Sequence, residues 1–240
     1  MTGRWKFCLI TSASVLALVC TLALGRWQLA RAAEKESMQA RIATQSALPP
    51  LEGLTLAVQV DPAAELHRNV RLRGRWLDQW TVFLENRPMQ GRVGLYVVTP
   101  LQLDGSAAVV WVQRGWVARN FVDRSHLPPL ETATGLVEIQ GRITPPPAKL
   151  YELGPAQSGR LRQNLDLAQF RRESALPLLV VSVQQLGPSG DGLVRDWPAP
   201  GSGVERHYGY AFQWFGLSGL ISLLYVWFQL VRRFIRPRRP

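Results

Sequence analysis

The sequence predicts an α+β membrane protein in which two transmembrane helices flank a mostly antiparallel β domain with short helices. Two features of the 240-residue chain predict this class. One long run without a charged residue lies near each end, and between the runs short β-rich stretches alternate with turn residues. Since strands at this spacing rarely leave their edges unprotected, a small closed barrel is one form that we expect for the β domain.

Residues 7–25 form the first apolar run. Its 19 residues carry no charge, and at the rise of an α-helix they reach about 28 Å, roughly the hydrocarbon thickness of a bilayer. A cleaved signal peptide is the alternative, because Arg4 and Lys6 precede the run. The run is long for a signal peptide, however, and it ends in Gly-Arg-Trp-Gln rather than in an Ala-x-Ala site. We therefore expect a retained transmembrane helix.

Residues 208–231 form the second run, which has 24 uncharged residues, with tyrosines and tryptophans toward its ends. Five arginines follow it, namely Arg232, Arg233, Arg236, Arg238 and Arg239. The positive-inside rule then predicts that both chain ends are cytoplasmic. We expect a bacterial inner-membrane protein with a cytoplasmic tail at 1–6, transmembrane helices at 7–25 and 207–231, a periplasmic domain at 26–206 and a basic cytoplasmic tail at 232–240.

The formal net charge of +11 does not indicate a nucleic-acid partner. Arg4, Lys6 and the five C-terminal arginines supply +7 of it, so residues 26–206 carry only +4, with basic and acidic residues interspersed. The distribution indicates a lipid bilayer as the partner of the basic flanks. Both cysteines, Cys8 and Cys20, lie in the first apolar run, so the predicted periplasmic domain offers no thiol for a disulfide.

The predicted periplasmic domain begins with a helix and continues as strands. Residues 27–44 are rich in helix-forming residues, and two prolines at 49 and 50 end the helix. Asp104-Gly105 predicts a hairpin, and Asn164 is the expected N-cap of a short helix. Residues 187–203 are expected to be a linker, because they are rich in Gly, Pro and Ser. Strands are predicted at 70–76, 81–85, 94–101, 107–113, 135–143 and 177–184.

Familiar catalytic motifs do not occur in the sequence, so we do not expect an enzyme. It contains no G-x-S-x-G, no H-E-x-x-H, no cysteine pair at metal-binding spacing and no phosphate-binding glycine loop. His67 and His126 are both expected to be exposed. The alternating Arg71, Arg73 and Arg75 fit a solvated strand face better than they fit an anion site.

His207 is the histidine that stands out, because it lies at the start of the second apolar run. Ala211, Trp214 and Phe215 follow at i+4, i+7 and i+8, so one helix face offers an imidazole, a small residue that leaves room, and aromatic walls. A flat apolar macrocycle with an axial ligand would suit that face. Packing against the first helix would suit it equally well.

Four groups of residues carry a family resemblance over nearly the whole chain. In order, these groups are Gly25, Trp27, Gln28, Arg31 and Lys35; Asn86-Arg87-Pro88 with Gly94 and Tyr96; Thr99-Pro100-Leu101 with Arg114-Gly115-Trp116-Val117; and His207, Tyr210, Ala211, Trp214 and Phe215. With these motifs the chain resembles the Surfeit locus protein 1 family of cytochrome c oxidase assembly factors. Gln113 and Arg206 depart from the family pattern, which usually has Asn at both places.

The resemblance implies that the protein binds haem a, with His207 as iron ligand, and helps to deliver it to oxidase subunit I. Haem A synthase and other oxidase assembly factors are further partners that it suggests. Tyr210, Ala211, Trp214 and Phe215 would surround the cofactor, and Arg206 would pair with a propionate. Trp27, Gln28 and Arg31 are further candidates. The alternative is a structural scaffold that holds oxidase subunits without haem.

The middle motifs have structural interpretations beside the functional ones. Trp116 is expected to be a core aromatic residue, and Gly115 to lie at a β-bulge or at a positive φ. Arg114 would either partner a buried carboxylate or line a surface for haem or for a partner protein. The same two alternatives stay open for Arg87.

Overall fold

A computed structural model describes residues 2–59, 61–120, 122, 127–151, 158–188, 191–198 and 203–232. His126 and the C-terminal arginines from Arg233 onward lie outside these residues, as does part of the predicted linker. The chain forms two compact units. A helical unit combines Met1–Ala40 with Ala199–Pro240, and a β unit consists of Arg41–Pro198.

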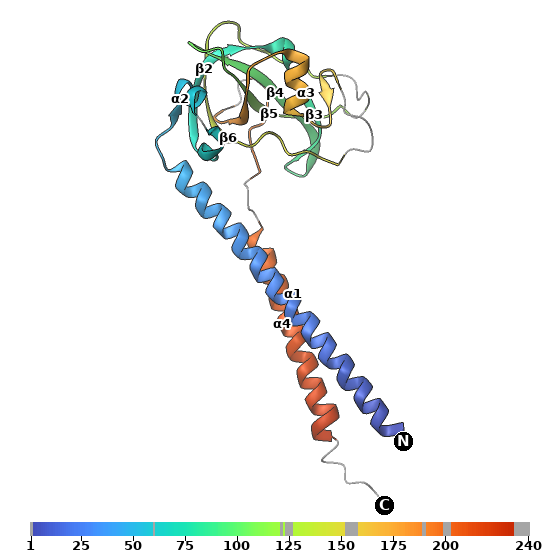
Figure 1. Ribbon diagram of the computed structural model, residues 1–240. Helices are drawn as coiled ribbons and strands as arrows, with labels where there is room; N and C mark the ends of the chain where they lie inside the picture. Colours follow the sequence, from blue (N-terminus) through green and yellow to red (C-terminus); the bar gives the residue numbers. More distant parts are fainter. Residues whose placement is uncertain are drawn as a thin grey trace, which may run out of the picture. The chain divides into compact units, whose positions relative to one another are not determined.

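The helical unit is an antiparallel pair of long helices (Figure 1). Helix α1 covers Thr2–Ser46, so the first apolar run and the predicted helix after it are one continuous helix. Helix α4 covers Val204–Tyr225 and continues as a π-helical stretch, η3, at Val226–Val231. Both helices are long and apolar enough to cross a membrane.

Small residues bring α1 and α4 into close contact. On α1 the buried positions are Thr21, Gly25, Gln28 and Ala32, and on α4 they are Val204, Ala211 and Ser218. These positions repeat every seven residues along each helix, as in coiled-coil packing. The Ser218 hydroxyl donates to Thr21 Oγ1 over 2.7 Å, and a methyl group on Gly25 would lie 2.8 Å from the Phe215 ring. Such spacing is typical of helix pairs packed within a membrane.

The β unit is an eight-stranded sheet in which five strands close into a barrel. Its order is β1-β2-β6-β8-β5-β4-β3-β7, and an additional pairing of β2 with β4 closes β2, β6, β8, β5 and β4 into a ring. Most pairs are antiparallel, and β5–β8 is parallel. The expected barrel is therefore confirmed. The strands are β1 Leu51–Glu52, β2 Asn69–Trp76, β3 Val82–Met89, β4 Arg92–Leu103, β5 Val109–Ala118, β6 Val137–Thr144, β7 Leu161–Arg162 and β8 Leu178–Gln185.

Buried apolar residues alternate with exposed residues along the strands, and the buried ones form the barrel core. In β2, Val70 and Leu72 are buried while Arg71, Arg73 and Arg75 are exposed, as the sequence pattern predicts. The Asp104-Gly105 turn joins β4 to β5 with Gly105 at φ +73°. Short helices cover parts of the sheet: α2 at Gly53–Val58, α3 at Leu167–Ser174, η1 at Pro62–Glu65 and η2 at Asp78–Trp80.

Two local predictions are wrong. The N-cap of α3 is Asp166, whose carboxylate accepts a hydrogen bond from the Gln169 amide over 2.9 Å. Asn164 instead pairs with the backbone N–H and C=O of Leu150. His67 is half-buried rather than exposed, because the chain turns there at φ +73° before entering β2.

The predicted linker also contains structured residues. Val194 pairs with Trp116 through two backbone hydrogen bonds of 2.7 and 2.8 Å, next to the end of β5. Leu193 and Trp197 are buried, and the Trp197 indole donates to the Gln185 carbonyl over 2.8 Å. Residues 191–198 are therefore part of the β unit, and the linker interpretation is wrong for them.

Candidate functional site

Arg114 is buried at a bulge in β5. Its neighbours Gln113 and Gly115 pair with successive residues of β4, so Arg114 is the extra residue of the bulge. Gly115 leaves space for the segment after β8, because a methyl group there would lie 2.6 Å from Leu193 Cβ. Trp116 is 4% exposed. The bulge and the core tryptophan are both confirmed.

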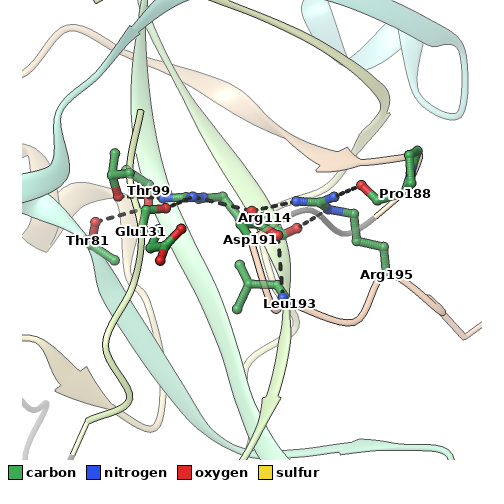
Figure 2. Close-up of polar contacts among 9 residues, drawn as sticks. Thr81, Thr99, Arg114, Glu131, Pro188, Asp191, Leu193 and Arg195 are labelled. Carbon is green, nitrogen blue, oxygen red and sulfur yellow. Dashed lines mark hydrogen bonds and ion pairs between the residues drawn. The ribbon is translucent and has the colours of Figure 1, made fainter. Parts of the chain in front are cut away.

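Three segments meet at the Arg114 guanidinium (Figure 2). It donates to the Thr132 hydroxyl and the Glu131 carbonyl, both over 2.9 Å, and contacts Asp191 Oδ2 at 3.4 Å. Arg195 donates to the same Asp191 oxygen over 2.6 Å and to the Arg114 carbonyl over 2.7 Å. Burial lowers the pKa of Arg114, and the charge of Asp191 opposes that shift. Arg114 thus partners a carboxylate, and it borders a cavity of about 500 Å³.

Arg87 in β3 is likewise buried, with 4% of its surface exposed. Its guanidinium donates to the backbone carbonyls of Ala148 and Gln163 over 2.8 and 2.9 Å. Its own carbonyl accepts a 2.8 Å hydrogen bond from the Trp116 indole. The structure therefore gives both guanidinium groups contacts within the fold, and Arg114 in addition borders the cavity.

The remaining candidates lie on the helical unit. His207 Nδ1 lies 2.7 Å from Gln28 Oε1 across the two helices. An amide oxygen can only accept a hydrogen bond, so Nδ1 must carry the proton. The neutral imidazole then has its lone pair on Nε2. Among the described residues, no hydrogen bond occupies Nε2.

Helix geometry divides the surroundings of this pair into two flanks. Successive residues of an α-helix are rotated by about 100° about its axis. Tyr208, which directly follows His207, therefore lies on one side of it. Glu36, two turns after Gln28, lies on the corresponding side of Gln28. The Tyr208 hydroxyl donates to Glu36 Oε1 over 2.8 Å, so these two sides adjoin. The other sides of His207 and Gln28 must then meet on the opposite flank.

Five of the nine predicted site residues on the helical unit share that opposite flank, which we call the aromatic flank. Its members are Trp27 and Arg31 on α1 with Arg206, Tyr210 and Trp214 on α4. Trp27 and Tyr210 are 51% and 52% exposed, and the Arg31 guanidinium lies 5.8 Å from the Trp27 ring centre. His207 and Gln28 lie at the inner edge of this flank.

Ala211 and Phe215 lie elsewhere. Ala211 is 2% exposed between the helices, and Phe215 packs against Gly25. The space beside Ala211 is therefore filled by α1, so the alternative of packing against the first helix applies to these two residues. Thr21 and Ser218 were not predicted as contact positions, although their seven-residue spacing from Gln28 and Ala211 was a usable signal.

The fold and the site define a class of protein in which a small β-barrel unit is combined with two apolar helices that meet at a histidine. A model of the SURF1 family matches residues 15–219, and the chain therefore belongs to the SURF1 family. This family is generally linked to the assembly of cytochrome c oxidase and is not a known enzyme family.

Two relatives are similar over most of their length. A SURF1-like protein of Drosophila melanogaster is 28% identical over 240 residues, covering 89% of this chain and 75% of the relative. A SURF1-like protein of Monosiga brevicollis is 24% identical over 231 residues, covering 87% of this chain and 83% of the relative. The family match includes both Gln28 and His207.

Proposed function

We propose that this protein assists cytochrome c oxidase assembly by holding haem a on His207 and passing it toward oxidase subunit I. In this proposal the helices cross a bacterial inner membrane, both chain ends are cytoplasmic and the β unit is periplasmic. The observation that carries the proposal is the 2.7 Å contact between His207 Nδ1 and Gln28 Oε1.

The donor chemistry at His207 fits a haem iron. A histidine that ligates a metal usually donates its other ring N–H to a carbonyl or carboxylate, which fixes the tautomer and raises the basicity of the ligating nitrogen. Gln28 accepts such a hydrogen bond here. In a haem the macrocycle itself fills four coordination positions, so one imidazole is a sufficient protein ligand. When bound, the haem supplies the iron centre that the oxidase requires.

The aromatic flank suits an amphipathic tetrapyrrole. Trp27, Tyr210 and Trp214 offer exposed or half-exposed ring surfaces beside His207. Aromatic residues at the end of an apolar run are typical of the membrane–water boundary. At that depth a macrocycle can lie against the rings while its polar edge stays near water. Because this flank is open, the ligand can leave without separation of α1 from α4, as a carrier requires.

The same hydrogen bond supports the second candidate function. His207 and Gln28 also hold the two helices together, and a scaffold for oxidase subunits would need such a contact without any haem. Haem content therefore separates the two functions.

The test is an absorption spectrum of the full chain purified from cells that make haem a. We expect the wild-type protein to carry haem a and the His207→Ala variant to lose it, while the thermal transition of the β unit is unchanged. Tyr208→Phe is the matched control, because it removes an interhelical hydrogen bond on the other flank. Unchanged haem a stoichiometry and absorption maxima in His207→Ala would contradict the proposal and favour the scaffold.

A further inference from the structure

The wall of the β-barrel has a gap near Arg114. Strand β6 pairs with β2 along Val137–Arg142, whereas its pairing with β8 begins only at Gly141. Strand β8 ends at Gln185, so it does not run beside the first residues of β6. Among the described residues, residues 137–139 therefore have a paired strand on the β2 side alone.

The free edge of β6 presents the backbone of Glu138. Successive residues of an antiparallel strand direct their N–H and C=O groups to opposite sides, so residues two apart direct them to the same side. The Gln140 carbonyl accepts a 2.8 Å hydrogen bond from the amide of Leu186, the residue after β8. Glu138 lies two residues before Gln140, and its N–H and C=O therefore point into the gap. Within the part of the chain that the structure describes, neither group has a hydrogen-bond partner.

The cavity of about 500 Å³ lies at this gap. Its walls include Val137 and Ile139 of β6, together with Arg114 of β5 and Gln185 at the end of β8. Two buried atoms of these walls, Arg114 Nε and Gln185 Oε1, lack a hydrogen-bond partner among the described residues. The first is a donor and the second an acceptor. A peptide group offers one acceptor and one donor, so an extended peptide complements both the walls and the free edge.

The unpaired charges at the cavity are acidic. Glu131 and Glu138 border it and are exposed, and in the described ranges neither carboxylate forms an ion pair. Arg73, which lies across from Glu138 on β2, pairs instead with Asp104 over 3.2 Å. The buried guanidinium groups already donate to Asp191 and to backbone carbonyls. A lysine or arginine on an added strand is therefore favoured over an acidic residue.

We infer that the gap binds an extended segment of a partner protein, which adds to the free edge of β6 and carries a basic side chain. The backbone of Glu138 sets the register of this segment, and its carboxylate with that of Glu131 attracts the cation. Arg114 Nε and Gln185 Oε1 bond further peptide groups. A stretch of about three residues matches residues 137–139. The inference concerns the β unit alone and does not rest on the proposed function.

The test uses two capped, fluorescently labelled peptides and the full chain in nanodiscs of zwitterionic lipid. One peptide has the sequence Thr-Val-Lys-Val-Thr, and the other has Glu in place of Lys. Fluorescence anisotropy measures their affinities, and hydrogen exchange is followed at the Glu138 and Ile139 amides. The Ala133→Trp variant fills the cavity, because Ala133 is exposed and lines it. Ala64→Trp is the matched control, since Ala64 is exposed on η1 and does not border the cavity.

We expect wild type and Ala64→Trp to bind the lysine peptide about threefold to tenfold more tightly than the glutamate peptide. The Ala133→Trp variant should lose binding of both peptides. In wild type, the lysine peptide should slow exchange at the Glu138 amide and leave exchange at Ile139 unchanged, because the Ile139 amide faces β2. Unchanged exchange at Ile139 in Ala133→Trp shows that the barrel is intact.

Three results would overturn the inference. Tighter binding of the glutamate peptide would make the buried arginines the recognition groups and an acidic segment the partner. Equal affinity of wild type and Ala133→Trp, or unchanged exchange at Glu138 on binding, would place the peptide elsewhere on the chain. Binding of neither peptide to wild type would show that the free edge of β6 does not accept a strand.

Discussion

The amide oxygen of Gln28 lies 2.7 Å from Nδ1 of His207 and joins α1 to α4 at that histidine. Because the oxygen fixes the proton on Nδ1, it presents Nε2 as the free lone pair. One contact thus has two consequences: it joins the two helices, and in the proposed function it prepares His207 as the iron ligand.

Gln28→Leu is expected to weaken haem a binding about tenfold to a hundredfold, because second-layer partners of metal-ligating histidines have effects of that size. Titration of the purified chain measures the affinity. The Tyr208→Phe variant should bind as the wild type does. Equal affinities for Gln28→Leu and wild type would show that the amide does not prepare the ligand.

The pairing of α1 with α4 is tested by cross-linking. A chain with Thr21→Cys and Ser218→Cys should form an intramolecular disulfide on oxidation in membranes, because the two hydroxyl oxygens lie 2.7 Å apart. Cys8 and Cys20, which are both exposed, are first replaced by serine. A pair with Leu22→Cys in place of Thr21→Cys should react poorly, since Leu22 is exposed. Equal yields from the two pairs would contradict the observed interface.

Trp116→Ala should lower the free energy of unfolding of the β unit by about 3–5 kcal/mol, because it removes a buried aromatic side chain. It also leaves the Arg87 carbonyl without its indole donor. Tyr151→Ala is the matched control, since Tyr151 is 85% exposed. Chemical denaturation of the full chain measures both. An unchanged transition in Trp116→Ala would show that the core assignment is wrong.

Strands of the β unit could be predicted from the sequence where one face of the strand is buried and the other is solvated. In β2 the alternation of Val70 and Leu72 with exposed arginines gave the strand, and Asp104-Gly105 gave the hairpin. Composition wrongly predicted a linker for residues 191–198, because Trp197 and Leu193 are held by contacts to strands that are distant in the sequence. Such contacts leave no periodic pattern in a segment rich in Gly and Pro.

The sequence indicated which residues are candidates for the site, but not how these residues are arranged in space. His207 and Gln28 were both candidates, yet nothing in either helix alone shows that they touch. For Ala211 both room for a ligand and packing against the first helix were open, and its 2% exposure favours packing, since a small apolar residue serves either purpose. Arg87 and Arg114 are buried because backbone carbonyls accept from them, and sequence patterns do not reveal such acceptors.

His67 predicts a pH dependence of stability. Burial lowers its pKa from the ordinary value of 6.5, and the charges of Arg142 and Arg41 lower it further. The unfolded chain therefore takes up a proton first as the pH falls below about 6.5, so this contribution to stability is present at pH 7 and decreases toward pH 5.

His67→Asn should remove this part of the pH dependence, because asparagine tolerates the observed φ of +73°. The thermal midpoint of the full chain, measured from pH 7.5 to 5.5, provides the comparison. If the thermal midpoint changes equally with pH in wild type and variant, groups other than His67 cause the pH dependence.

Iron ligation by His207 is tested most directly by replacing its side chain with free imidazole. The His207→Gly variant, purified and titrated with haem a, should lack the wild-type absorption spectrum and regain it when imidazole is added, because the missing nitrogen is then supplied from solution. The Tyr208→Gly variant should show the wild-type spectrum both with and without imidazole, since Tyr208 is not the proposed ligand. A His207→Gly chain that shows the wild-type haem a spectrum without imidazole would contradict the account.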